Sequence, residues 1–147
     1  MAAIQLTKSD WESGSFLPKF PIPPIARFLG TSFEHHDPDK GVLRVSFPTK
    51  AEYANPGGTV MGGIVASFLD DAMGPLVVAA TGGGYFPATL DLHITYFKPV
   101  PIGPRAIVEA RVDRLGRSTV FTNASILSED GEELARAVHT ATLRPVG

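Results

Sequence analysis

The sequence predicts an α+β fold in which a curled antiparallel β-sheet wraps around one long central helix. One apolar stretch, residues 63 to about 80, carries its apolar side chains at helical spacing. Other segments alternate apolar and polar residues with a period of two, as half-buried strands do. Since 147 residues match the usual size of one folded unit, we expect a single domain over 1–147.

The composition excludes several classes of partner. A hydrophobic share of 44%, a charged share of 19% and a formal charge of −2 give no electrostatic reason to expect nucleic acid or an anionic membrane. There are no cysteines, which rules out disulfides and thiolate chemistry and fits a reducing compartment. We find no signal-peptide pattern in the first 15 residues and therefore expect a cytoplasmic location.

The first 24 residues form a proline-rich arm. Four prolines between positions 18 and 24 predict no regular structure before Ile25 and favour an arm on the surface. Directly afterwards, Pro24 near the start and Gly30 past the end of "PPIARFLG" indicate a short helix.

Alternation over residues 32–47 predicts the first strand, and a loop over 49–59 leads into the helix of residues 63–80. That helix carries small or apolar residues on most of its circumference, while Asp70, Asp71 and Pro75 argue against a membrane span. One sheet cannot cover so wide an apolar surface, so we expect a second subunit to cover the rest.

After a turn at residues 81–88, four further strands are predicted. They cover 89–98, 105–115, 118–128 and 132–143, and the short links between them predict an antiparallel meander. With the strand at 32–47 this makes a five-stranded sheet.

The two adjacent aspartates inside the apolar helix need an explanation, because a buried carboxylate is costly unless it is paired, hydrogen-bonded or neutral. One explanation is structural: Asp70 or Asp71 caps or pairs with a group on the solvent side. The other is functional, because Asn55 and Gly62-Gly63 lie in the loop that enters the helix. The N–H groups at a helix N-terminus favour a developing negative charge.

These residues also carry a family resemblance. Asn55, Met61, Gly62, Gly63 and Asp70 follow the pattern N-x(5)-H-G-G-x(6)-[DE], with methionine in the histidine place. In this pattern the chain resembles the hotdog-fold acyl-CoA thioesterases of the phenylacetyl-CoA thioesterase-like branch of the 4-hydroxybenzoyl-CoA thioesterase superfamily. The resemblance spans roughly residues 40 to 143. It includes Gly57 and the stretches "DDAMG", "TLDLHITYFKPV", "GR" at 116–117 and "DGEELARAVHTATL".

The resemblance implies a hotdog fold and hydrolysis of acyl-CoA to free acid and CoA, without a cofactor and with coenzyme A as part of the substrate. In it, Asp70 is the general base or nucleophile, and the Gly62 N–H binds the carbonyl oxygen as charge builds. Asn55 orients the water or the acyl group, and a hydroxyl at Thr89 helps to place the water.

The spacing adds a requirement for a partner. Asp70 follows Gly62 by eight residues, so along a straight helix the two are about 12 Å apart, too far to share one carbonyl. We therefore expect a homodimer, and a dimer of dimers, with each active site built from two chains. Asp71 lies about 100° further around the helix, and we interpret it as structural.

Met61 departs from the family pattern. A thioether cannot carry a proton or donate a strong hydrogen bond, so Met61 and Gly63 form a substrate loop without the usual histidine. This keeps open a second hypothesis, a non-catalytic protein that binds acyl-CoA or acyl thioesters. A third, a hotdog dehydratase or hydratase, comes last because neither the loop nor the helix contains a histidine.

Cations, aromatic residues of the arm and histidines are also considered as site residues. By resemblance, the phosphates of coenzyme A are met by cations near strand ends, here Lys98, Arg114 and Arg117, although scattered surface cations are the alternative. We expect three aromatic residues of the arm to pack over the acyl pocket or the neighbouring subunit: Trp11, Phe16 and Phe20. His35-His36 have no visible third ligand, so no metal is expected. His93 and His139 are interpreted as ordinary sheet residues.

Overall fold

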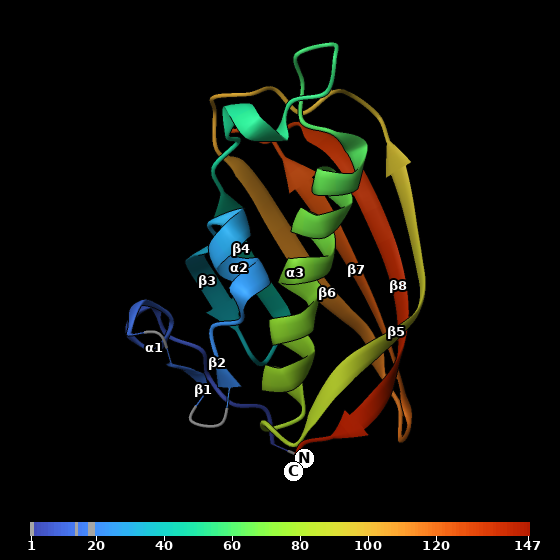
Figure 1. Cartoon of the computed structure of the whole chain (residues 1–147). Helices are drawn as coiled ribbons and strands as arrows, with labels where there is room; N and C mark the ends of the chain where they lie inside the picture. Colours follow the sequence, from blue (N-terminus) through green and yellow to red (C-terminus); the bar gives the residue numbers. More distant parts are fainter. Residues whose placement is uncertain (1, 14, 18–19) are drawn as a thin grey trace.

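A six-stranded sheet curls around one helix, and the N-terminal arm and a short helix lie along one side of it (Figure 1). The computed structural model describes residues 2–13, 15–17 and 20–147, and no side chains between 14 and 21. The expected packing of Phe16 and Phe20 therefore lies outside the described residues. The elements are α1 (Lys8–Glu12), β1 (Ser15–Leu17), β2 (Phe20–Pro21), α2 (Pro24–Leu29), β3 (Ser32–Asp37), β4 (Val42–Phe47), the 3₁₀ turn η1 (Ala51–Tyr53), α3 (Gly62–Ala80), β5 (Tyr85–Tyr96), β6 (Ala106–Leu115), β7 (Thr119–Leu127) and β8 (Glu133–Pro145).

The sheet has six strands in the order β3-β4-β6-β7-β8-β5, all antiparallel, so the prediction of five was wrong. The segment 32–47 is a hairpin. The Asp37 carboxylate accepts hydrogen bonds from the Asp39 and Lys40 N–H groups, and Gly41 has a positive φ of 64°, which together close the turn. Sequence alternation runs through both strands and does not reveal this turn.

The prediction of a four-stranded meander was wrong for its first strand, β5, which does not pair with β6. β6, β7 and β8 follow one another, but β5 pairs with β8 and forms the edge of the sheet. β5 also starts at Tyr85, inside the predicted turn at 81–88. The link from β5 to β6 therefore runs from the edge of the sheet to its middle. Sequence periodicity cannot reveal this connection, because periodicity identifies strands but not the strands they pair with.

The arm is more ordered than predicted, since α1, β1 and β2 all precede Ile25. Leu6 and Trp11 are 2% and 7% exposed, and the indole of Trp11 lies 5.9 Å from the ring of Phe33. The Ile4 N–H donates to the Ala79 carbonyl and the Leu6 N–H to His36 Nδ1. These contacts fasten the arm to both α3 and β3.

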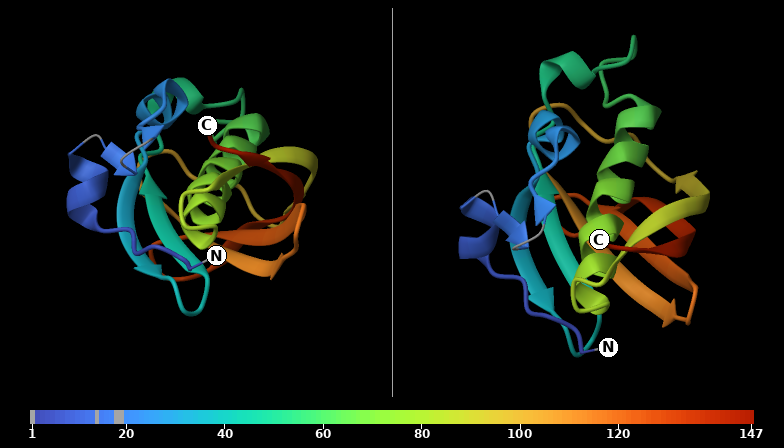
Figure 2. Two further views of the ribbon diagram at one scale, coloured as in Figure 1. Left: turned by 90° about the horizontal axis from the view of Figure 1, so that it is seen from below. Right: turned by 60° about the horizontal axis from the view of Figure 1, so that its bottom comes forward.

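α2 confirms the predicted short helix and ends at Gly30, whose φ of 73° suits glycine. α3 confirms the predicted long helix and lies in the hollow of the sheet, which Figure 2 shows from two further directions. Its buried side includes Phe68, which stacks on Phe47 with ring centroids 4.5 Å apart. Among the described residues, α3 is the one helix whose length and composition would allow a membrane span, but packing in the core explains the same composition.

Candidate active site

A pocket of about 420 Å³ lies between α3, β5 and the arm with α2. The face of α3 that the sheet leaves uncovered supplies one wall, at i, i+3, i+4, i+7, i+8 and i+11 spacing: Ser67, Asp70, Asp71, Gly74, Pro75 and Val78. Phe86, Pro87 and Thr89 of β5 form a second wall. The pocket is therefore mostly apolar, and Asp70 and Thr89 contribute to its polar part.

Asp70 carries a perturbed carboxyl. Asp70 is exposed to solvent in this chain, yet the protein around its carboxyl desolvates it enough to raise its pKa above the ordinary 3.8, and the nearby His139 opposes the shift. Burial lowers the pKa of His139 below 6.5, while Asp70 and Asp91 raise it. A carboxylate of raised basicity beside an apolar pocket is suited to accept a proton from water.

A β-bulge lies at Thr89, which lines the same pocket as Asp70. The register of β5 against β8 shifts between Thr89 and Asp91, so one extra residue, Leu90, is 63% exposed. Thr89 and Leu92 would face opposite sides of a regular strand, yet Leu92 packs on the core and the Thr89 hydroxyl lies 2.8 Å from His139 Nε2. The bulge therefore turns the Thr89 hydroxyl toward the helix.

His139 is a site residue that sequence reasoning missed. It is 3% exposed on β8, and its Nδ1 lies 3.0 Å from the Thr122 hydroxyl. The Thr122 hydroxyl also lies 3.3 Å from the sulfur of Met73, a weak acceptor, so the imidazole bridges the hydroxyls of Thr122 and Thr89 in either of its two neutral tautomers. The sequence pattern could have indicated this role. His139 lies on the same strand face as the buried Ala137 and Ala141, and a buried histidine needs polar partners.

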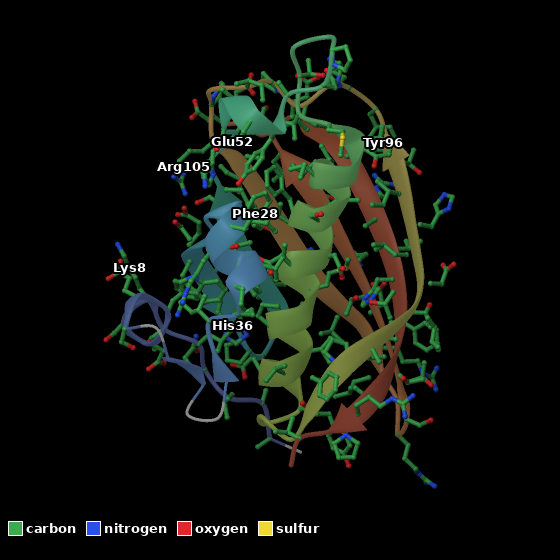
Figure 3. The ribbon with its side chains drawn as sticks, viewed as in Figure 1. Lys8, Phe28, His36, Glu52, Tyr96 and Arg105 are labelled. Carbon is green, nitrogen blue, oxygen red and sulfur yellow. The ribbon has the colours of Figure 1, made fainter. Side chains whose placement is uncertain are left out.

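The first turn of α3 forms a separate candidate region. Gly62 is the first helical residue, so no carbonyl of the same helix can accept its N–H. Tyr96, at the end of β5, donates from its hydroxyl to the Gly62 carbonyl at 2.6 Å, and Figure 3 labels Tyr96 beside this turn. Met61 is 50% exposed at the N-cap, makes no capping bond, and its methyl end lies next to Gly63.

Asn55 holds the loop before this helix. Its side-chain carbonyl accepts from the Thr59 N–H at 3.1 Å, and its amide donates to the Thr59 hydroxyl at 3.1 Å. The backbone N–H of Asn55 also donates to the Thr59 carbonyl at 2.8 Å. Within one chain, the Asn55 side chain is therefore engaged with the loop and does not meet Asp70.

Asp71 has the structural partner that its position suggested. Its carboxylate accepts a hydrogen bond of 2.5 Å from the Thr31 hydroxyl. Burial raises the pKa of Asp71, the Thr31 bond lowers it, and Asp70 raises it further. The Thr31 carbonyl also accepts from the indole N–H of Trp11 at 3.2 Å. Asp71 therefore ties α3 to the segment that connects α2 with β3.

The three expected phosphate-binding cations do not cluster in one chain. Lys98 follows Tyr96, at the end of the sheet near the start of α3, and pairs with Glu132. Arg114 and Arg117 lie at the opposite end, where β6 turns into β7. For the described residues, no group of three or more histidines and acids suited to a metal ion is present.

Comparison with known proteins decides the family, because a model of the thioesterase superfamily matches residues 57–135, just over half of the chain. The chain belongs to the thioesterase superfamily. It has the hotdog fold that the resemblance implied. Human acyl-coenzyme A thioesterase 13 is 28% identical over 104 residues, which cover 70% of this chain and 74% of the relative. An archaeal relative, a putative esterase of Saccharolobus solfataricus, is 30% identical over 68% of this chain and 70% of its own length.

Solved structures of the superfamily agree with the fold. A putative thioesterase from Ralstonia eutropha JMP134, described as related to phenylacetic acid degradation, has a TM-score of 0.80 at 29% identity over 91% of this chain and 97% of its own. Thioesterase HI1161 from Haemophilus influenzae has a TM-score of 0.82 at 15% identity over 99% of this chain and 96% of its own, a likeness of fold alone. The thioesterase-superfamily match begins at residue 57, so the arm and α2 precede it.

Proposed function

We propose that this chain hydrolyses acyl-CoA thioesters to a free acid and coenzyme A. The observation that carries the proposal is the Asp70 carboxylate, with its raised pKa, at an apolar pocket that Thr89 also lines. Membership of the thioesterase superfamily and relatives named as acyl-CoA thioesterases support it.

In the proposed reaction, the Asp70 carboxylate accepts a proton from a water molecule as the water oxygen attacks the thioester carbonyl carbon. We place the proton of His139 on Nδ1, so that the Thr89 hydroxyl donates to Nε2 and the Thr89 oxygen is free to accept a hydrogen bond from that water. Collapse of the tetrahedral intermediate breaks the carbon–sulfur bond, and the proton held by Asp70 goes to the departing thiolate. Direct attack by Asp70 through an anhydride is the alternative for the same residue.

The negative charge on the carbonyl oxygen needs a donor, and we propose the Gly62 N–H of a second copy. The rise of α3 places Gly62 and Asp70 of one chain about 12 Å apart, so a carbonyl beside Asp70 is out of reach of its own Gly62. β5 is a 12-residue edge strand with one side unpaired in this chain, and such an edge can pair with another copy. The proposed unit is a homodimer with two sites, which could assemble further into a dimer of dimers.

A second candidate function rests on Met61. Because its thioether supplies no proton and no strong hydrogen bond, the same pocket could bind acyl thioesters without cleaving them. Calorimetry with an acyl-CoA, combined with the absence of thiol release, would support this binding function.

The test measures thiol release from short, long and aromatic acyl-CoAs by the purified chain and by Asp70→Asn. We expect kcat to fall by about 10²- to 10⁴-fold in Asp70→Asn, because the amide cannot act as a base. Asp71→Asn is the matched control, since it makes the same change in the neighbouring residue and retains an acceptor for Thr31; its kcat should stay within about threefold. Equal kcat in Asp70→Asn and wild type would refute the assigned base.

A further inference from the structure

Gly74 leaves an unfilled space beside the proposed base. It lies one helical turn after Asp70 on the pocket wall, and its φ is not positive. A Cβ built at Gly74 would have no heavy atom within 4 Å, apart from its chain neighbours and its own helix backbone. Glycine weakens a helix interior, and close packing does not explain its presence in this chain. One reason is Pro75, because proline disfavours a Cβ on the helical residue before it. A second reason, which would also use the open space, is room for a bound group that passes Asp70.

Trp11 lines the same pocket from the arm. Its indole also borders a second cavity of about 530 Å³, together with Ile22 and Ala26, so these three side chains separate the two spaces. Lys8 and Arg105, labelled in Figure 3, line the second cavity and not the pocket with Asp70. Contact with Phe33 and the bond to the Thr31 carbonyl hold the indole in place as a partition.

The charges of the lining restrict what can lie between these two residues. Among the described lining residues there is no lysine, arginine or histidine, whereas Asp70 and Asp71 both border the pocket. An uncharged hydrocarbon or aryl group can be buried there favourably. An acyl chain that ends in a carboxylate would meet two acids and no cation, which disfavours it.

We propose that Gly74 and Trp11 set the length of the acyl group that this chain accepts. Gly74 admits an uncharged, apolar acyl chain past Asp70, and Trp11 stops that chain at the arm. The proposal rests on the proposed thioesterase function. It places the length limit in an arm that precedes the part of the chain matched by the superfamily model.

The experiment measures kcat/KM of the full chain over straight-chain acyl-CoAs from acetyl to palmitoyl, with glutaryl-CoA as the charged probe. In Gly74→Val the optimum should move to shorter chains, with about a fourfold loss for each methylene that no longer fits. In Trp11→Ala it should move to longer chains, because the pocket then joins the second cavity. Glutaryl-CoA should be a poorer substrate of the wild type than butyryl-CoA.

Controls separate length selection from damage to the fold. Pro75 disfavours a helical residue with a Cβ before it, so Gly74→Val is also made in a Pro75→Ala background and compared with Pro75→Ala alone. Ala66→Val changes the same helix outside the pocket lining and should keep the wild-type length profile. Trp11→Phe keeps a large ring and should shift the optimum less than Trp11→Ala.

The outcomes are distinct. A wild type that releases no thiol overturns the proposed function, and this proposal with it. A wild type that hydrolyses acyl-CoAs, with variants that lose activity equally at every length, overturns the length assignment alone. Dissociation of a dimer by Gly74→Val, measured by light scattering, also overturns it, because a second copy would then fill the space beside Gly74.

Discussion

The first turn of α3 and its middle differ in how they are built. At the first turn, the group of interest is a backbone N–H, while the nearby side chains are occupied elsewhere: Asn55 with Thr59, and Tyr96 with the Gly62 carbonyl. At the middle, the proposed catalytic and positioning groups are side chains from three elements, Asp70 of α3, Thr89 of β5 and His139 of β8. One region depends on helix geometry and the other on the register of the sheet.

This difference indicates which part of the reaction each region can perform. A helix N-terminus offers fixed N–H groups to an anion and has no proton to exchange. The middle region offers a carboxylate of raised pKa at a pocket that the Thr89 side chain also lines, and a carboxylate can exchange a proton. The two regions are complementary, and the spacing along α3 explains why they would meet between two chains.

The largest effect that tests the first region is expected from Gly62→Pro. Proline is well tolerated at the first position of a helix, where its missing N–H leaves no helical bond unmade, and Met61 already has the extended backbone that precedes proline. The variant therefore removes the proposed oxyanion donor and keeps the helix. We expect kcat for the best acyl-CoA to fall by about 10²- to 10³-fold.

Gly62→Ala is the matched control for this variant, because it keeps the N–H. Its Cβ would lie 3.4 Å from the Tyr96 hydroxyl, an ordinary contact. If Gly62→Ala and Gly62→Pro lose activity to the same extent, the effect comes from the added side chain, and the backbone N–H is not the donor. Circular dichroism of both variants checks that α3 remains folded.

A smaller effect, about tenfold in kcat, is expected from His139→Gln in the second region, since His139 acts by holding Thr89. The acid limb of kcat/KM supplies the decisive measurement. In the proposed mechanism Asp70 is the ionised base, so activity should fall as the pH drops through its raised pKa. His139 lowers the pKa of Asp70, so its loss should raise that pKa and move the acid limb to higher pH.

A purely structural role for His139 predicts another result: reduced activity with an unmoved acid limb. Thr122→Val provides the comparison, because it removes the partner of His139 Nδ1 and leaves the imidazole in place. Its acid limb should move less than that of His139→Gln. The comparison therefore separates the charge of His139 from its packing.

Much of the first region could be predicted from the sequence, because its features are local. The order Asn55, Gly62, Gly63 along one segment fixes a loop and a helix start, and α3 begins within one residue of its predicted position. Turn chemistry and helix periodicity depend on neighbours in the chain. The family pattern is found in the same segment.

The second region could be predicted only for Asp70 and, by resemblance, Thr89. The partnership of Thr89 with His139 depends on β5 pairing with β8 and on the bulge at Leu90, which are both non-local. Strand periodicity assigned His139 correctly to a sheet, but it could not show which side chains the imidazole contacts in the core. The arm was mispredicted for a similar reason, since the contacts of Leu6 and Trp11 with β3 outweigh the local effect of the prolines.

The smallest expected effect concerns Met61, the one residue of the first region that departs from the family pattern. Its side chain is half exposed and lies beside Gly63, so a histidine can replace it without entering the core. An imidazole N–H could add one hydrogen bond to the polarised thioester, which corresponds to a rise of about two- to tenfold in kcat/KM. Thiol release by Met61→His and by the isosteric control Met61→Leu measures this. A loss in Met61→His, with Met61→Leu unchanged, would mean that the loop is adapted to an apolar side chain and that the first turn works through its backbone alone.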